Sequence, residues 1–203
     1  MKKVILLLSG LFILTACQND KDTTDTTWDS FVEKYQKKED NMTENIKKIN
    51  LEEYSFLIPK VYDASLVKDS KNMEKYLFDK KELDIHDSPV PTVLYGGIYN
   101  SDENIFITLM YLVNNTDREI EDISFNYDLD LTTIGGENEG NFPYSYKEIS
   151  SESIPSKTVV PIFLGAKNVN LTNKKTVYSG EDMSNIEVSN MTIHYKDGTT
   201  EIN

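Results

Sequence analysis

Residues 123–131 read ISFNYDLDL, and this stretch decides the fold. Apolar side chains occupy every second position, with serine, asparagine and aspartate between them. Successive side chains of a β-strand point to opposite faces of its sheet, so the alternation predicts a strand with one face in a core and the other in water. A sheet with one wet face is typical of antiparallel proteins.

The segments around this stretch also predict strands. Residues 92–99 are apolar around a Gly-Gly pair, and residues 105–113 are apolar at both parities, as expected of a central strand that is covered on two sides. Residues 158–164 predict a further strand, in which Pro161 indicates an edge or a bulge.

The C-terminal residues predict a bulge and a hairpin. Ile186 and Val188 occupy even positions, whereas Met191, Ile193 and Tyr195 occupy odd ones, so we expect a bulge near residues 189–190. Asp197-Gly198 is a strong signal for a hairpin turn. Six or seven short strands over about 110 residues suit an antiparallel β-sandwich.

In the residues before the predicted strands, apolar side chains recur with the period of a helix. Apolar side chains in residues 28–49 recur at alternating steps of four and three, which predicts one seam along an amphipathic helix. The seam consists of Trp28, Val32, Tyr35, Glu39, Met42, Ile46 and Ile49. We expect this helix to pack on its own chain. A two-stranded coiled coil is the alternative, and the acid in the seam disfavours it.

Shorter helices are expected between this helix and the prolines at positions 89 and 91. A second helix is predicted over residues 51–58, another can restart over residues 60–66, and a last one is predicted from residue 69 or 70 to Phe78. The prolines favour extended backbone and end the helical period. The fold class is therefore predicted to be α+β, with a helical region at residues 28–88 and an antiparallel β-sandwich domain at residues 89–203 that folds by itself.

The N-terminal residues predict export. Two lysines precede an apolar run over residues 4–14, which is too short for a membrane span of about 20 residues, so residues 1–16 are predicted to be a signal peptide. The run ends in Leu14, Thr15, Ala16 and Cys17. These four residues resemble the lipobox of bacterial lipoproteins. The resemblance implies cleavage before Cys17 and a diacylglycerol on its thiol, with acyl chains such as palmitate as the membrane anchor.

The composition of the chain bears on the expected tether and on the kind of cell that exports the protein. Cys17 is the sole cysteine, so the fold has no intramolecular disulfide to rely on. Residues 17–27 are predicted to be the lipidated cysteine and a flexible tether, because residues 18–27 have no apolar side chain that could pack. One arginine among many lysines, asparagines and isoleucines suggests a bacterium of low genomic GC content. Together with the lipobox resemblance this favours a Gram-positive bacterium, with the protein on the extracellular face of the cell membrane.

Residues 105–169 also resemble the immunoglobulin-like modules of Gram-positive surface lipoproteins. A long apolar strand, an Asn-Asn-Thr turn, an alternating strand, a glycine-rich acidic loop and a proline-led strand follow one another. The resemblance implies a fold and carries no activity with it.

The charge excludes nucleic acid as a partner. Without the predicted signal peptide the chain has 19 basic and 34 acidic residues, a net charge of −15. Binding to nucleic acid requires a basic surface, which this composition does not provide. We expect the acidity to keep the protein soluble beside a membrane, and an acidic docking face for a basic partner is the alternative.

The sequence offers no catalytic motif. It has no Gly-x-Ser-x-Gly, phosphate loop or dinucleotide fingerprint, and its two histidines, His86 and His194, lack zinc-site spacing. We expect no enzyme, no cofactor and no metal. A calcium site at Asp128, Asp130 and the glycine-rich loop after them is an alternative that the EF-hand spacing does not support.

Three alternating aromatic residues are the candidate binding residues. Phe142, Tyr144 and Tyr146 follow the glycine-rich loop and either present rings to a partner or form a strand that covers the core. We expect a non-enzymatic, lipid-anchored surface lipoprotein whose sandwich binds or shields a protein or glycan partner. The alternative is an accessory or immunity subunit of an export, cell-wall or transport system that docks through its helical region.

Overall fold

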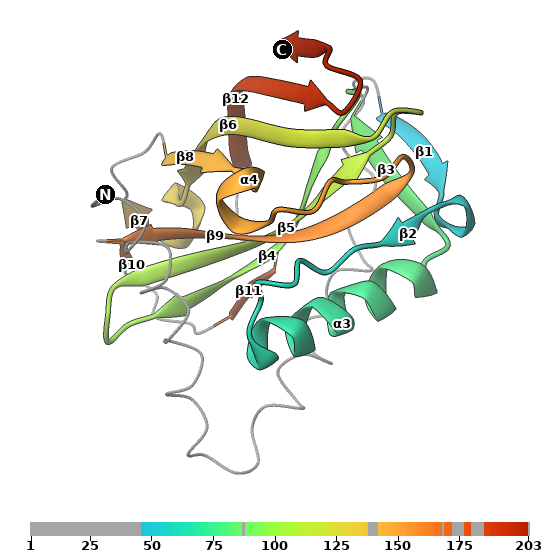
Figure 1. The fold of residues 1–203 in the computed structure, drawn as a ribbon. Helices are drawn as coiled ribbons and strands as arrows, with labels where there is room; N and C mark the ends of the chain where they lie inside the picture. The colour runs from blue at the N-terminus through green and yellow to red at the C-terminus, as the bar shows by residue number, and fades with distance from the viewer. Residues whose placement is uncertain are drawn as a thin grey trace.

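The computed structural model describes residues 46–86, 88–137, 142–167, 169–171, 177–179 and 185–202. Strands dominate this part of the chain, and its longest helix is α3 (Ala64–Asp79). Its two larger sheets have four and five strands. In Figure 1 the smaller of them lies above the larger, and α3 lies below the larger. The prediction of a chain rich in strands is confirmed. Of the helix predicted over residues 28–49, residues 28–45 lie outside the described residues.

The larger sheet is built around β5 (Ile105–Asn114). Its order is β11 (Val177–Ser179), β4 (Thr92–Asn100), β5, β9 (Thr158–Lys167) and β2 (Ser55–Phe56). β5 pairs antiparallel with β4 and with β9. All its side chains are buried except that of Ile107, which is half-buried, so the prediction of a central strand covered on both sides is confirmed.

Pro161 lies just beyond the point where β2 leaves β9. β2 pairs with Thr158 and Val159, and it does so in the parallel direction. Proline has no N–H to donate, so it fits the side of β9 where the described chain places no further strand. The edge position predicted from Pro161 is confirmed, whereas the parallel pairing of β2 departs from the antiparallel expectation.

The smaller sheet has the order β13 (Thr200–Ile202), β12 (Asn185–Tyr195), β6 (Ile120–Asp130) and β8 (Phe142–Ser145). β6 buries Ile123, Phe125, Tyr127 and Leu129, as their alternation predicts. These side chains meet Phe106, Met110, Ile162 and other residues of the larger sheet in one core. The two sheets therefore pack face to face through their apolar sides.

The bulge and the hairpin near the C-terminus lie where the sequence predicts them. The register between β12 and β6 shifts between Ser189 and Thr192, and Asn190 has a φ of 53°. Gly198 has a φ of 86° in the turn before β13, and its N–H donates to the Tyr195 carbonyl at 3.0 Å.

The helices predicted over residues 46–58 are wrong. This segment forms β1 (Ile46–Asn50), the 3-10 turn η2 (Leu51–Glu53) and β2. β1 pairs antiparallel with β3 (Glu82–His86), which places Ile49 opposite Leu83. The spacing of Ile46 and Ile49 suits one face of a helix, but in a strand the two side chains point to opposite faces. Ile49 is 5% exposed and Ile46 is 44% exposed.

The two helices predicted between residues 60 and 78 are one continuous helix. Asp63 caps α3, since its Oδ1 accepts the N–H groups of Ser65 and Leu66 at 2.9 Å each. α3 then buries Leu66, Met73 and Leu77. None of the described helices is long and apolar enough to cross a membrane.

A second core lies between α3 and the larger sheet. It joins Leu51, Met73 and Leu77 with Leu109 and Val159. The Tyr111 hydroxyl also donates to the Met73 carbonyl at 3.0 Å. The domain division at residues 88 and 89 stays a prediction, but side chains from both sides of it share this core.

Candidate functional site

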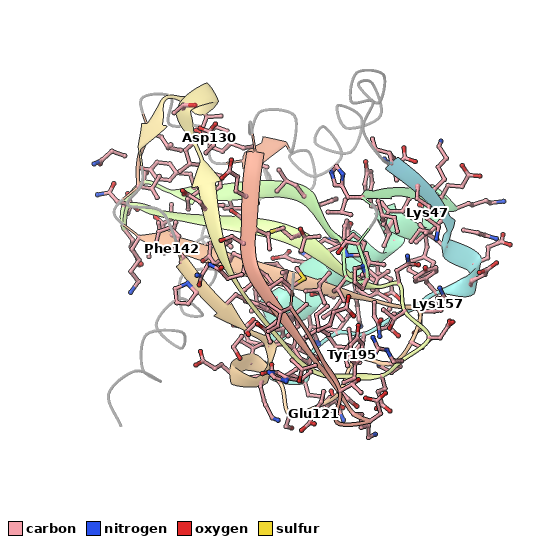
Figure 2. All side chains as sticks on the ribbon, turned by 90° about the horizontal axis from the view of Figure 1, so that it is seen from above. Lys47, Glu121, Asp130, Phe142, Lys157 and Tyr195 are labelled. Atoms are coloured by element: carbon pink, nitrogen blue, oxygen red, sulfur yellow. The ribbon has the colours of Figure 1, made fainter. Side chains whose placement is uncertain are left out.

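The outer face of the smaller sheet is polar. β6 alternates its buried side chains with Asp122, Ser124, Asn126, Asp128 and Asp130. The register places His194 of β12 opposite Asp122, Thr192 opposite Ser124 and Glu187 opposite Asp128. Figure 2 shows Asp130 at one end of this sheet, and Glu121 and Tyr195 at the other.

The surface is hollowed at the Glu121 end. A cavity of about 390 Å³ lies between β6, the end of β12, the hairpin turn and α4 (Tyr146–Ile149). It is lined by Glu121, Asp122, Lys147, His194, Tyr195, Gly198 and Thr199. We call it the polar pocket.

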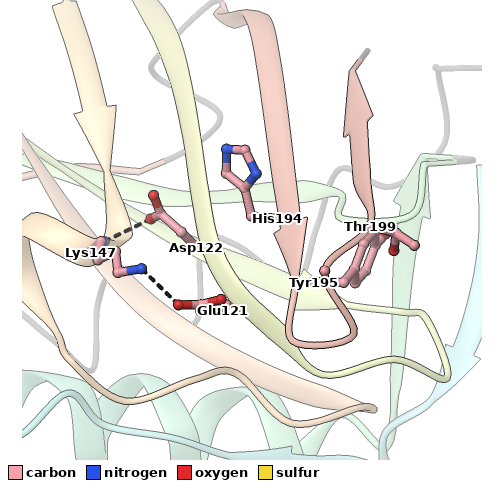
Figure 3. Close-up of a pocket in the computed structure, with 7 residues that line it drawn as sticks. Glu121, Asp122, Lys147, His194, Tyr195 and Thr199 are labelled. Carbon is pink, nitrogen blue, oxygen red and sulfur yellow. Dashed lines mark hydrogen bonds and ion pairs between the residues drawn. The ribbon is translucent and has the colours of Figure 1, made fainter.

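Lys147 ties α4 to β6 inside the polar pocket. Its backbone N–H donates to Asp122 Oδ1 at 2.9 Å, and its Nζ donates to Glu121 Oε1 at 2.8 Å (Figure 3). α4 directly follows β8, and β8 pairs with β6, so the backbone of Lys147 lies next to the residues that carry these carboxylates. The ion pair is exposed, so it orders the site more than it stabilises the fold.

The same contact keeps both partners charged. The hydrogen bond from Lys147, followed by its charge, lowers the pKa of Glu121 below its ordinary value. The hydrogen bond and the charge of Glu121 raise the pKa of Lys147 above its ordinary value. At neutral pH the pocket therefore presents an ammonium group and a carboxylate side by side.

His194 adds a group that can donate or accept. Its side chain is exposed on the pocket wall, and its Nδ1 lies 3.0 Å from Thr200 Oγ1. Within the described residues its Nε2 has no hydrogen-bond partner, so this nitrogen is open to a ligand. Figure 3 shows the imidazole ring beside Asp122 on the neighbouring strand.

The polar pocket suits recognition of a polar surface. It offers donors from Lys147 and His194 and acceptors from Glu121 and Asp122, whereas the Thr199 hydroxyl already donates to Asp197 and accepts from Arg118. Sites for small molecules are usually enclosed and mostly apolar, whereas this hollow is open and polar. Peptide groups and glycan hydroxyls both donate and accept, and they match this set of side chains.

The rings of the predicted binding residues are turned toward the core. Tyr146 is fully buried, and Tyr144 is 9% exposed and stacks on Phe125 with 4.6 Å between ring centroids. Phe142 is half-buried and packs beside Tyr127 at 5.4 Å. Of the two alternatives for these aromatics, the burial supports the strand that covers the core. Binding of a partner through them stays a prediction.

The glycine-rich loop is described only in part. Gly135 has a φ of 71°, as expected of a glycine that ends the short turn η3 (Thr132–Ile134). Asp130 Oδ1 accepts the backbone N–H of Thr132 at 2.9 Å, so one carboxylate of the calcium alternative shapes the turn. In the described ranges no three acidic, histidine or cysteine side chains lie close enough together to hold a metal ion.

The remaining predicted residues are dispersed. His86 ends β3 and is exposed, far from the polar pocket in sequence and on another sheet. Cys17, Leu14, Thr15 and Ala16 lie outside the described residues.

The sequence does not predict most of the polar pocket. It draws attention to His194 as one of two histidines, but no motif marks Glu121, Asp122 or Lys147 as a site. The alternation of β6 already indicates that Asp122 faces water, and the hairpin signal places His194 near a turn. Nothing in the sequence indicates that Lys147, 26 residues after Glu121, returns to its side.

Comparison with known proteins gives no relative. The sequence matches no protein-family model and no curated protein, and the fold matches no solved structure at a significant level.

Proposed function

We propose that this chain is a non-enzymatic lipoprotein, anchored by lipid to the extracellular face of the cell membrane, that binds a protein or glycan partner through the outer face of its smaller sheet. The observation that carries the binding role is the polar pocket. It presents paired donors and acceptors on an open surface, and such a surface suits an extended polar partner better than a small substrate.

The strand order supports an immunoglobulin-like module. β4, β5 and β9 lie in the order of strands A, B and E of that fold, and β13, β12 and β6 lie in the order G, F and C. β8 then occupies the place of strand C′ beside C. Modules of this kind bind through their loops and outer faces while the core between the sheets holds them rigid.

The lipobox supports the location. A diacylglycerol on Cys17 supplies two acyl chains, and each buried CH₂ contributes about 0.8 kcal/mol, so two chains hold a protein where a single myristoyl chain does not. The tether at residues 18–27 spans up to about 30 Å when extended, which is enough to lift the module off the membrane. With a net charge of −15 after cleavage, the module is repelled by anionic headgroups.

Photo-crosslinking in intact cells tests the binding role. A photoreactive phenylalanine analogue at position 194 should form an adduct with a protein or glycan, whereas the same analogue at Ser151, an exposed turn residue, should not. The double change Glu121→Gln and Lys147→Gln, which removes the ion pair and keeps the shape, should reduce the adduct. Failure to obtain an adduct specific to position 194 would remove the polar pocket as the binding site.

A further inference from the structure

Among the described residues, one edge of the larger sheet has no neighbouring strand beyond Val159. The Leu57 N–H donates to the Val159 carbonyl at 2.9 Å, and the Tyr62 hydroxyl donates to the Pro161 carbonyl at 2.9 Å. Both carbonyls therefore point away from β5. Main-chain groups of an antiparallel strand alternate between its two sides, so Phe163 and Gly165 also point outward. We call residues 162–167 of β9 the open edge.

No strand of the described chain pairs with the open edge. β2 pairs only with the first two residues of β9, and Figure 1 shows it below one end of that strand. The Gly165 carbonyl accepts a hydrogen bond from the Tyr127 hydroxyl at 3.3 Å and keeps a second lone pair. The N–H groups of Phe163 and Gly165 and the carbonyl of Phe163 remain as a short ladder. Such a ladder is a template for another extended chain.

Gly165 provides room for a large side chain on the incoming strand. It is exposed, and a Cβ built on it would meet no atom within 4 Å. Ile107, its cross-strand partner, and Phe163 are half-buried, and they form an apolar floor beside the vacant position. Large or aromatic side chains commonly pack across a strand pair over a glycine, where no side chain obstructs them.

The flanking residues limit the length of the pairing. Pro161 cannot donate to an added strand, and beyond Lys167 the chain leaves β9 to form β10 (Asn170–Leu171), which pairs with β7 (Gly136–Glu137). Two copies paired through so few residues would bury far less than the roughly 1,200 Å² of a stable interface. The open edge is therefore better suited to a short peptide segment than to a second copy.

We propose that the open edge of β9 binds an extended segment of a partner polypeptide, with a large apolar side chain of that segment placed over Gly165. The main-chain ladder selects for an extended polypeptide, and the space over the glycine selects the side chain. Basic residues near the segment are favoured by the net charge of −15. This site goes beyond the polar pocket and lies on the other sheet, so either site can fail without the other.

A designed peptide tests the proposal. The probe is the acetylated and amidated peptide KTVFVTK, added to isotope-labelled residues 18–203 without the lipidated cysteine. We expect saturable NMR shifts centred on the amides of Phe163 and Gly165, and slower hydrogen exchange of both. The control peptide has N-methylphenylalanine in place of phenylalanine, so it lacks the N–H that faces Gly165 in antiparallel pairing and should bind about tenfold more weakly.

Two protein variants distinguish binding at the open edge from nonspecific binding of the peptide. Gly165→Lys places a charge in open space, so the melting temperature should not change while binding of KTVFVTK falls at least about tenfold. Ser151→Lys adds the same charge at an exposed turn and should bind like the natural chain. Equal binding by Gly165→Lys, or equal shifts from both peptides, would overturn the proposal. A dimer in sedimentation that Gly165→Lys abolishes would assign the edge to a second copy instead.

Discussion

The chain's single arginine closes the C-terminal hairpin onto the body of the protein. The Arg118 guanidinium lies 3.4 Å from the centroid of the Tyr195 ring, and its Nη2 lies 3.2 Å from Glu201 Oε2. The Tyr195 hydroxyl donates to the same carboxylate oxygen at 3.0 Å, and Arg118 Nη1 donates to Thr199 Oγ1 at 2.9 Å. A planar cation is needed here, because it must stack on a ring and bond a carboxylate at once.

We expect Arg118→Ala to lower the free energy of unfolding by about 1–2 kcal/mol, the sum expected of a partly exposed cation–π contact and a partly exposed ion pair. Arg118→Lys should recover less than half of this loss, since an ammonium is a point charge without a face to stack. Urea unfolding of the three proteins measures both differences. Identical stabilities for the lysine variant and the natural chain would show that only the charge matters.

Asp69 has a carboxyl group that is buried, where its charged form is unfavourable. It lies on the buried face of α3 with 9% exposure, and burial raises its pKa to about 6, with Lys68 opposing and Asp63 adding to the shift. The pKa in the fold is higher than in the unfolded chain, so folding favours the protonated form. The free energy of unfolding that protonated Asp69 contributes is therefore fully present below about pH 4, and it is lost as the pH rises through 6.

Asp69→Asn should therefore stabilise the protein at pH 7 by about 2–3 kcal/mol, an order-of-magnitude value from the size of the pKa shift. The difference between the two proteins should shrink as the pH falls from 6 and vanish near pH 4. Thermal melts at several pH values measure it. A difference that does not depend on pH would mean that the asparagine acts through packing.

At the scale of elements, the bulge in β12 keeps two parts of one strand in register with β6. Asn190 takes the left-handed conformation that lets Ile186 and Val188 on one side of it, and Ile193 on the other, all pack toward the core. Without the extra residue, one of these sets would face water, because a shift of one residue reverses every side chain of a strand.

Substitutions at Asn190 should follow backbone preference. Asn190→Gly should leave the stability within about 0.5 kcal/mol of the natural chain, since glycine adopts positive φ freely. Asn190→Val should cost about 1–2 kcal/mol, because a branched side chain is strained there. Chemical unfolding compares the two. If valine is tolerated as well as glycine, the bulge is not fixed by this residue.

At the scale of the molecule, both faces of the larger sheet are apolar and buried, so each of them needs a packed layer to exclude water. Its upper face packs on the smaller sheet, and its lower face packs on α3, β1 and β3. Tyr95, Leu109 and Tyr111 are each at most 2% exposed on the lower side. The independent folding of residues 90–203 stays a prediction, and these contacts favour the opposite outcome.

A fragment of residues 89–203 tests this point. Without residues 46–88 it would expose several aromatic and aliphatic side chains at a cost of about 1.5–3 kcal/mol each, which exceeds the margin of most small domains. We expect no cooperative thermal transition in the fragment and a clear one in residues 46–203. A cooperative transition in both would support the division at residue 88.

The proposed lipid anchor also belongs to the scale of the whole molecule. Cys17→Ala should move the protein from the membrane fraction to the medium or leave an uncut precursor, because no other thiol can carry lipid. Labelling cells with radioactive palmitate and separating membranes measures both effects. Unlabelled natural protein would contradict the lipoprotein proposal.

The sequence by itself determined the long strands of the two sheets, but not β2 or β11 at the edges of the larger one. The alternation in residues 123–131, the apolar run in 105–113, the parity change at 189–190 and the Asp197-Gly198 turn are local signals, and each depends only on where successive side chains point. They also determined which side of β6 meets water, and so the wet side on which the polar pocket lies.

Only the tertiary structure decided the rest. Ile46 and Ile49 fit a helix by spacing, but pairing with β3, more than thirty residues later, makes their segment a strand. The contact of Lys147 with Glu121 and the open edge of β9 likewise depend on which distant segments become neighbours. A local period is shared by many pairings, and the burial of apolar surface across the whole chain selects one of them.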